Sequence, residues 1–393
     1  MTLRRFAFPL LAYAFAAIMV GTTLPTPMYS LYSDQMNFSV LTTTVVFATY
    51  AGGVLFALVA FGRWSDAIGR RPVLLGGVDF ALASAVVFLL ADSVSMLLIG
   101  RVLSGLSAGV FTGTATAAVI EAAPPAWRTK AAAVATIANV GGLGAGPVVA
   151  GLLVQYAPHP LHLSFVVHIA LALLAGFAVL VVPETSERVG RVGLQRLSVP
   201  AEVRPVFVVA GLAAFAGFSV TGLFMAVAPS FVADVVGIDN HALAGLVAAS
   251  IFAASAVAQV GARGIAPARA VAIGCGVLVA GMAIVVVALY FSSLTGLVAA
   301  GLVAGVGHGM TFSRGLAAVV EHTPAHRRAE VSSTYFVVAY VAISLPVVGE
   351  GLAAQAWGLR TAGASFAVAV AVLAAICLTT IVTQETRRAR VGV

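Results

Sequence analysis

Charged side chains are scarce in this chain of 393 residues, because Asp, Glu, Lys and Arg together make up only 9% of it. Soluble globular proteins carry about 25% charged residues, so the composition excludes a water-soluble fold of this length. Cysteine is scarce too: Cys275 and Cys377 are the only two, and both lie inside apolar runs. Two such cysteines exclude the disulfide framework of a small secreted domain.

Motifs for ATP binding and for embedded catalysis are missing from the sequence as well. The chain has no Gly-x4-Gly-Lys-Ser/Thr loop, which excludes the usual phosphate-binding site of an ATP-driven pump. It has no His-rich metal motif and no Ser/Lys pair on facing apolar segments. We therefore expect a protein that is not an enzyme and that uses no metal and no cofactor.

Long apolar runs are what the chain has in abundance: 61% of its residues are hydrophobic, and the mean hydropathy is +1.07. A membrane-spanning helix needs about 20 apolar residues, whereas a β-barrel would show alternating segments of about ten. The continuous runs predict an all-α membrane protein with twelve transmembrane helices. The predicted spans are 7–30, 41–62, 72–91, 94–118, 129–155, 162–182, 205–231, 242–262, 268–290, 294–318, 330–354 and 361–382.

The basic residues predict the orientation of these spans. If the N-terminus is inside, 18 of the 21 Lys and Arg residues fall in inner segments, including Arg4, Arg5, Arg388 and Arg390 at the two ends. This is the positive-inside pattern, and it accounts for the net charge of +7 without nucleic-acid binding. We expect a multi-pass protein of the inner (plasma) membrane with both termini cytoplasmic.

A repeat divides the chain into two halves. Residues 121–128 recur as 321–328, with Glu, Pro and Arg at the same places, and Gln155 recurs as Gln355. Matches at these residue types are not expected by chance in Ala-rich sequence, so we predict two pseudo-symmetric six-helix bundles. The predicted parts are an N-terminal bundle over 1–182, a cytoplasmic linker over 183–204 and a C-terminal bundle over 205–393.

The loop between the second and third predicted helices, residues 62–74, reads Gly-Arg-Trp-Ser-Asp-Ala-Ile-Gly-Arg-Arg-Pro-Val-Leu. It resembles the loop signature of the major facilitator superfamily, which has Gly, Asp four residues later, then Gly-Arg-Lys/Arg and Leu. The chain departs from it at Trp64, Ser65 and Ala67, which puts only auxiliary contacts in doubt. The resemblance extends over the whole chain and implies the two-bundle transporter fold with its substrate site at the bilayer midplane.

In that family the loop is a latch that locks the two halves on the inner side. A carboxylate at a helix end can bind the free N–H groups of a neighbouring helix N-terminus, and arginines can hold it there. The alternative is an ordinary basic loop on the inner side. The expected latch residues are Gly62, Asp66, Gly69, Arg70 and Arg71.

The fourth predicted helix carries Arg101 before the small residues Gly105 and Gly109, which resembles the helix 4 signature of the family. A charged side chain within a span costs at least about 2.5 kcal/mol, so we expect it to be paired or to face a wet cavity. The resemblance implies a role for Arg101 in proton coupling. The alternative is an arginine that snorkels to the outer interface.

The fifth predicted helix holds Gly142, Gly146, Pro147 and Gly151, which resembles the antiporter signature Gly-x3-Gly-Pro-x2-Gly-Gly with Ala150 in place of one Gly. Small residues allow a partner helix to approach closely, and a proline frees a carbonyl and bends the helix. Within the superfamily this signature marks exporters, chiefly drug–proton antiporters.

The end of the first predicted helix is broken by Pro25 and Pro27 and followed by Tyr29 and Tyr32. The resemblance to exporters implies that these residues line the substrate path or its outer gate. An interfacial aromatic belt is the alternative for the two tyrosines. His308, between two glycines, is a further substrate-path candidate, with a hydrogen-bonded packing role as its alternative.

A proton carrier needs a titratable side chain that changes access, and desolvated carboxylates serve this purpose. The candidates are Asp79 and Glu350, the latter opposite Ala150 in the repeat. Asp79 has the alternative of an ion pair with the inner-loop arginines.

The sequence as a whole predicts a monomeric secondary transporter that exports a small amphiphilic molecule or drug in exchange for protons across the bilayer. The alternatives are a proton-coupled uptake symporter of the same fold and a non-transporting membrane sensor.

Overall fold

The computed structural model describes residues 3–391, and the side chains of 6–387 among them. The described part contains helices and no strands, and twelve helices are long and apolar enough to cross a membrane. The predicted fold class is confirmed. The α-helices are α1 (Leu3–Thr23), α2 (Tyr29–Met36), α3 (Val40–Phe61), α4 (Trp64–Ile68), α5 (Arg70–Leu89), α6 (Val94–Glu121), α7 (Ala131–Tyr156), α8 (Leu163–Val181), α9 (Arg204–Ala226), α10 (Ala228–Ser230), α11 (His241–Gly261), α12 (Pro267–Tyr290), α13 (Leu294–Glu321), α14 (Arg328–Trp357) and α15 (Leu359–Val391). The side chains of Arg4, Arg5, Arg388 and Arg390, used above for the orientation, lie outside the described ones.

The predicted spans differ from the helices mainly at the two ends of the chain. The first span was predicted to end at residue 30, but the chain continues through η1 (Thr26–Met28) and α2 to Met36. The last was predicted to end at residue 382, whereas α15 runs on to Val391. Both errors arise because a helix can continue beyond its apolar stretch into polar residues.

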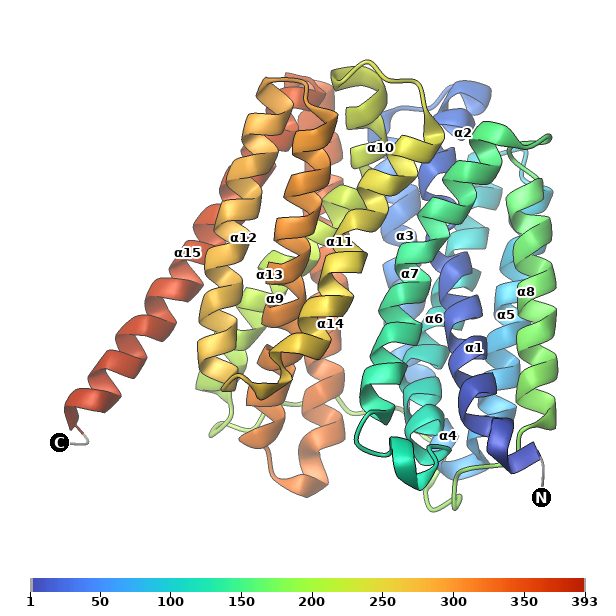
Figure 1. The fold of residues 1–393 in the computed structure, drawn as a ribbon, viewed down its shortest axis with the longest axis vertical. Coiled ribbons are helices and arrows are strands. Elements are labelled where there is room, and N and C mark those ends of the chain that lie inside the picture. Colours follow the sequence, from blue (N-terminus) through green and yellow to red (C-terminus); the bar gives the residue numbers. More distant parts are fainter. Residues whose placement is uncertain (1–2, 392–393) are drawn as a thin grey trace. The chain divides into compact units, whose positions relative to one another are not determined.

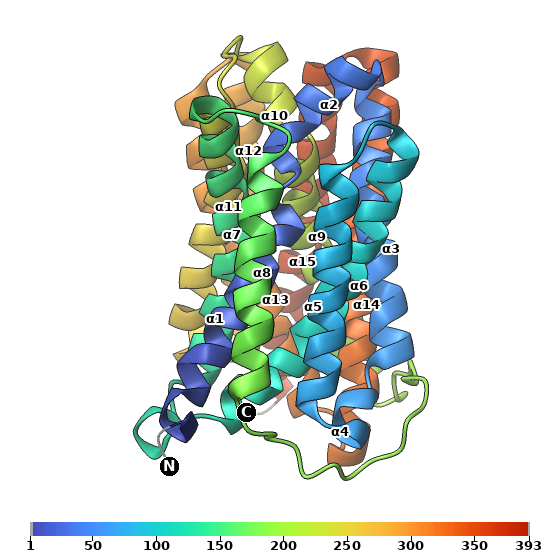
Figure 2. The ribbon, with the colours of Figure 1, turned by 90° about the vertical axis from the view of Figure 1, so that its right-hand side faces the viewer.

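The contacts between Cα atoms divide the chain into two units. Unit 1 consists of residues 1–196 and 240–249, and unit 2 of residues 197–239 and 250–393. In unit 1, α1 packs on α7 and α8, α3 packs on α6, and α5 packs on α6 and α8. In unit 2, α12 packs on α13 and α15, and α9 packs on α13 and α14. Within each unit the long helices run side by side (Figures 1 and 2).

The two units repeat each other in local structure. Helices α6 and α13 begin directly after Ser93 and Ser293 and both end 28 residues later, at Glu121 and Glu321. Helices α1 and α9 both end shortly before a short helical segment that begins at or near a proline. In unit 1 this segment is η1, and in unit 2 it is α10, which contains Pro229 and leads into the π-helical turn Phe231–Val235. Proline lacks an N–H and its ring displaces the preceding turn, which explains both interruptions.

The connection between α8 and α9 is extended and is fixed to each unit at neighbouring residues. The Gln195 N–H donates to the Val59 carbonyl at 2.8 Å, within unit 1. The Ser198 N–H donates to Thr334 Oγ1 at 3.0 Å and Arg327 donates to Ser198 Oγ at 2.6 Å, within unit 2. Only two residues separate these attachments.

Candidate functional site

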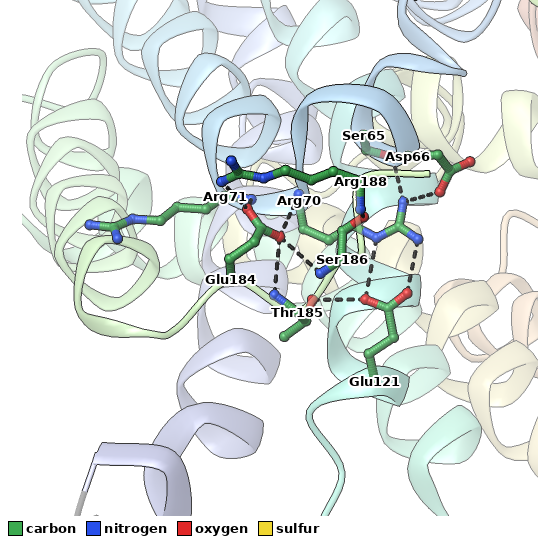
Figure 3. Close-up of polar contacts among 9 residues, drawn as sticks. All are labelled: Ser65, Asp66, Arg70, Arg71, Glu121, Glu184, Thr185, Ser186 and Arg188. Carbon is green, nitrogen blue, oxygen red and sulfur yellow. Dashed lines mark hydrogen bonds and ion pairs between the residues drawn. The ribbon is translucent and has the colours of Figure 1, made fainter. Parts of the chain in front are cut away.

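A network of charged side chains lies at the end of unit 1 that carries α4 and the start of α5 (Figure 3). Arg70 is its centre. Its guanidinium pairs with Asp66 at 2.6 Å and with Glu121 at 2.8 Å, and a second nitrogen reaches Glu121 at 3.3 Å. The same guanidinium donates to Ser65 Oγ at 2.7 Å. One arginine thus connects α4, α5 and the end of α6.

Glu184 caps the N-terminus of α5 from the segment that follows α8. The backbone N–H groups of Arg70 and Arg71 donate to its two carboxylate oxygens at 2.8 and 3.1 Å. The N–H groups of Thr185 and Ser186 also donate to it, each at 3.0 Å. Partial burial acts to raise the pKa of Glu184, but the four N–H donors outweigh it and lower the pKa. The cap places a negative charge where the helix dipole favours one.

Gly69 is required where it stands, between α4 and α5. Its φ of +110° lies in the region that side-chain-bearing residues avoid. A Cβ at this position would also overlap the carboxylate of Glu184. The close approach of Glu184 to the helix N-terminus therefore depends on a residue without a side chain.

The structure brings together part of the predicted latch. Asp66, Gly69 and Arg70 belong to the network, whereas Arg71 contributes its backbone N–H and has an exposed side chain. Gly62 lies at the end of α3, where an added Cβ would come within 3.4 Å of the Gln195 side chain.

The two glutamates of the network, Glu121 and Glu184, were not among the predicted latch residues. Both were visible as repeat landmarks, since each recurs in the second half as Glu321 and Glu385. Their role was not visible, because their partners on α5 lie 51 and 114 residues away in the chain.

Arg101 lies in the interior of unit 1 rather than at its surface, with only 2% of the residue exposed. Its Nη1 donates to the Thr22 carbonyl at the end of α1, at 2.7 Å, and its guanidinium lies 4.7 Å from the centre of the Tyr50 ring. It forms no ion pair with any described residue, and its Nε has no hydrogen-bond partner. The predicted alternative of snorkelling to an interface is therefore wrong.

Tyr29 and Tyr32 are buried in unit 1, with 3% and 1% of each residue exposed, so they do not form an exposed aromatic belt. They lie on the first turn of α2, which follows the break made by Pro25 and Pro27. Neither hydroxyl has a hydrogen-bond partner among the described residues. The predicted proline break thus positions two buried, unsatisfied hydroxyl groups.

The glycines of α7 bring this helix against α1. An added Cβ would lie 2.6 Å from the Ala16 carbonyl at Gly142 and would overlap Thr23 at Gly146. Pro147 cannot donate to the Leu143 carbonyl four residues earlier, and Thr23 Oγ1 donates to it instead at 2.8 Å. A hydroxyl of α1 thus satisfies the carbonyl that the proline of α7 leaves free.

The C-terminal part of α7 also contacts the first turns of α11, which belong to unit 1. An added Cβ at Gly151 would lie 3.1 Å from the Cα of Ala242, and one at Gly245 would overlap the Pro147 carbonyl. The Gln155 side chain accepts a hydrogen bond from the His241 N–H at 2.8 Å. The signature residues of α7 therefore serve two close helix contacts.

Glu350 is a buried carboxylate of unit 2, with 3% of the residue exposed and no hydrogen-bond partner for either oxygen among the described residues. It lies on α14, four residues after Pro346, and its counterpart 200 residues earlier in the repeat is Ala150 on α7, three residues after Pro147. The carbonyl that Pro346 leaves free, that of Ala342, lies 3.3 Å from Ser219 Oγ on α9, which also donates to the Phe215 carbonyl at 2.8 Å. The proline–hydroxyl contact is thus repeated, while the carboxylate occurs only in unit 2.

The remaining two predicted residues have different surroundings. Asp79 on α5 is exposed and makes no ion pair with the described arginines, so its predicted alternative is wrong. His308 on α13 is buried, its Nδ1 lies 2.9 Å from Ser255 Oγ, and its ring stacks on Phe312. This is the hydrogen-bonded packing that was its alternative, although its Nε2 has no partner.

Comparisons with known proteins agree with this fold. The tetracycline resistance protein, class D, of Salmonella ordonez is 34% identical over 116 residues, which cover 27% of this chain and 29% of that protein. The multidrug transporter MdfA of Escherichia coli O157:H7 is 28% identical over 187 residues, which cover 47% of this chain and 45% of that protein. The matched stretches thus span less than half of either curated relative.

Two solved structures share the fold over nearly the whole chain. A bacterial homologue of the human lysosomal transporter Spinster, in an inward-facing and unoccupied conformation, superimposes with a TM-score of 0.73 at 15% identity, covering 98% of each chain. The human organic anion transporter MFSD10 gives a TM-score of 0.67 at 16% identity, covering 95% of this chain and 99% of that one. The sequence profile of the Major Facilitator Superfamily matches residues 10–347, and the chain belongs to this family of membrane transporters.

Proposed function

We propose that this transporter exports a small amphiphilic molecule or drug in exchange for protons, by alternating access of two six-helix bundles. The bundles are residues 1–182 and 205–393, and the linker 183–204 stays on the cytoplasmic side with both termini. The protein works as a monomer in the inner membrane. Its family membership makes it a transporter of small molecules, and the partial matches to MdfA and to a tetracycline resistance protein favour drugs as the substrate class.

The observation that carries the export direction is the contact between α7 and α1. Three residues of the antiporter signature form this contact: Gly142 and Gly146 allow α1 to approach, and Pro147 leaves a carbonyl for Thr23. Glycine faces of this kind hold two helices together without long side chains between them. A tightly packed α1–α7 pair supports a seal that keeps protons from leaking along this side of the substrate path.

The inner-end network supports the role of a latch. Arg70 holds Asp66 on one side and Glu121 on the other, so the carboxylate of Asp66, which is 59% exposed, is kept in a fixed position and remains available. An exposed carboxylate in this position can bind the free N–H groups of a helix N-terminus in the other bundle. We infer that this contact forms when the inner side is closed and breaks when it opens.

Proton coupling is assigned to Glu350, with Arg101 as the fixed positive charge. Glu350 is buried and has no partner, which is the state in which a carboxylate must bind a proton or a cation. Asp79 is the weaker candidate, because its side chain is exposed at the surface of unit 1 rather than enclosed within the helix bundle. The substrate path is assigned to the region of Tyr29 and Tyr32.

Drug efflux from cells that lack their own exporters tests this proposal. Cells expressing the chain are loaded with a fluorescent amphiphilic dye and energised, with and without a protonophore. We expect faster efflux than in empty-vector cells, abolition by the protonophore, and loss of the proton-driven part in Glu350→Gln. Asp79→Asn is the matched control and should retain most of the activity.

Two results would contradict the proposal. Proton-driven accumulation of the dye in the same cells would establish uptake rather than export. Efflux that a protonophore leaves unchanged would remove the proton as the coupling ion, whichever variant is used.

A further inference from the structure

A pocket of about 370 Å³ lies within unit 2, between α9, α14 and α15. Its volume is in the range of sites that bind small molecules, about 300 to 1,000 Å³. Most of its lining is apolar, and three aromatic side chains contribute to it: Phe215 from α9, Trp357 from α14 and Phe366 from α15. Exposed lining residues, among them Gly349 and Ala369, mark its opening at the surface of the unit.

Glu350 is the one ionisable side chain among the described residues that line this pocket. The residue is 97% buried, and neither carboxylate oxygen has a hydrogen-bond partner. Desolvating a carboxylate without a partner is costly, and a cation within hydrogen-bond distance removes most of that cost. Two hydroxyl-bearing residues, the buried Ser219 and the exposed Ser365, also line the pocket and add polar atoms to it.

We propose that this pocket binds the protonated amine of an amphiphile, with the ammonium group on Glu350 and the apolar body against the aromatic side chains. An ammonium is the cation that fits both the carboxylate of Glu350 and the aromatic walls, because it donates to carboxylate oxygens and is attracted to aromatic faces. A hard metal ion such as Ca²⁺ or Mg²⁺ does not fit, since it requires about six oxygen ligands and the site offers a single carboxylate and mostly apolar walls. The amine comes either from a phospholipid headgroup of the ethanolamine type or from a free lipophilic amine.

The inference goes beyond the proposed export, because the site lies within one unit and its occupation requires no proton gradient and no change of access. Binding and transport can therefore fail independently. If the amine binds and no efflux is seen, only the proposed function is wrong; if efflux is seen and no amine binds, only this site is wrong.

Fluorescence of Trp357 measures binding directly. The chain has three tryptophans, so Trp64→Phe and Trp127→Phe leave Trp357 as the sole reporter beside the pocket. The full chain is placed in nanodiscs of phosphatidylcholine and titrated with n-dodecylamine, with n-dodecanol as the neutral compound of the same length. We expect a saturable change with the amine and, for the alcohol, an affinity at least about 10-fold weaker, since a charge-assisted hydrogen bond is lost.

Two variants test separately the carboxylate of the site and the apolar space beside it. Glu350→Gln removes the charge and should weaken dodecylamine binding by about 10-fold or more, with no effect on dodecanol. Ala369→Leu keeps the carboxylate and fills the pocket, so it should weaken binding of both compounds. Ala364→Leu, on the same helix but away from the pocket, is the matched control and should bind as the unmodified chain does.

Adding phosphatidylethanolamine to the nanodiscs distinguishes the two sources of the amine. A headgroup that occupies the site competes with dodecylamine and raises its apparent Kd, and this shift should be absent in Glu350→Gln. An unchanged Kd assigns the site to free amines. Equal affinity for amine and alcohol, or unchanged amine binding in either Glu350→Gln or Ala369→Leu, would overturn the proposal.

Discussion

The two units share their helix pattern but carry their buried charges at different positions. Arg101 lies on α6 of unit 1, and the residue 200 positions later on α13 of unit 2 is Gly301. A side chain has no room there, because even a Cβ at Gly301 would overlap Ser250. Conversely, Glu350 of unit 2 stands where unit 1 has Ala150. The repeat therefore preserves the packing of the helices and not the chemistry inside them.

The units also differ at the starts of α5 and α12. In unit 1, Glu184 binds the first N–H groups of α5, whose N-terminal residue is Arg70. In unit 2, α12 begins with Pro267, which has no N–H to offer, and the counterpart of Glu184 is the exposed Glu385 beside a pocket of about 240 Å³. Among the described side chains, the network around Arg70 and Glu184 thus has no counterpart in unit 2.

Among the changes that test this difference between the units, replacement of Arg101 should have the largest effect, a lower rate of efflux. Arg101→Gln removes the buried charge that distinguishes unit 1, together with the hydrogen bond to the Thr22 carbonyl, and should lower the initial rate of efflux at least about 10-fold. Arg314→Gln is the matched control on α13, because Arg314 is only partly buried. Dye efflux at equal amounts of membrane-inserted protein measures both, and an equal loss in the two variants would remove the special role of Arg101.

Replacement of Gly69 should have the next largest effect, this time on stability. Gly69→Ala places a Cβ at a positive φ and against Glu184, which should destabilise unit 1 by about 1–3 kcal/mol. Gly76→Ala is the matched control in the interior of α5, where a Cβ meets nothing within 4 Å and should stabilise the helix slightly. Thermal unfolding in detergent measures both, and a Tm for Gly69→Ala equal to that of the control would show that the tight approach of Glu184 is not needed.

The sequence predicted the parts of this structure that depend on local composition. The spans follow from the length of the apolar runs, the break before α2 follows from Pro25 and Pro27, and the α7 contacts follow from its glycines. Each of these features depends on residues that are neighbours in the sequence, so it can be predicted without the tertiary structure.

The sequence could not predict which carboxylates are buried and which bind a distant helix. Asp79 and Glu350 both stand within apolar spans, but one side chain is exposed and the other is buried. A membrane helix is apolar on its lipid side as well as on its protein side, so the pattern of hydrophobic residues does not reveal which way a side chain points. The roles of Glu121 and Glu184 depend likewise on contacts with a distant helix.

Removal of the charge on Glu184 should have a moderate effect that depends on pH. Glu184→Gln weakens the cap of α5 and should cost about 1 kcal/mol at pH 7. The pKa of Glu184 is lowered in the folded protein, so its stabilising effect is complete above the unfolded value of about 4.3 and disappears as the pH falls further.

The difference in Tm between the unmodified chain and Glu184→Gln should therefore be constant from pH 7 to about 5 and shrink below about 4. Glu385→Gln is the matched control in unit 2, where the counterpart carboxylate is exposed and α12 begins with a proline that offers no N–H. It should leave the Tm unchanged across this range. A difference for Glu184→Gln that grows at low pH would contradict the cap, because it would mean that the neutral carboxyl is the stabilising form.

The smallest effect should come from the contact that both units share, the hydroxyl that satisfies a carbonyl freed by proline. Thr23→Val removes a hydrogen bond of 2.8 Å to the Leu143 carbonyl and should cost about 1 kcal/mol, since the carbonyl is left without its donor. Ser219→Ala removes a longer contact of 3.3 Å to the Ala342 carbonyl. Because the single hydroxyl hydrogen of Ser219 also has the Phe215 carbonyl of its own helix at 2.8 Å, losing this contact should cost less. Both variants keep the shape of the helix contact, so thermal unfolding compares the two bonds directly. A larger loss of Tm for Ser219→Ala would mean that unit 2 depends on this contact more than unit 1, which the two distances do not predict.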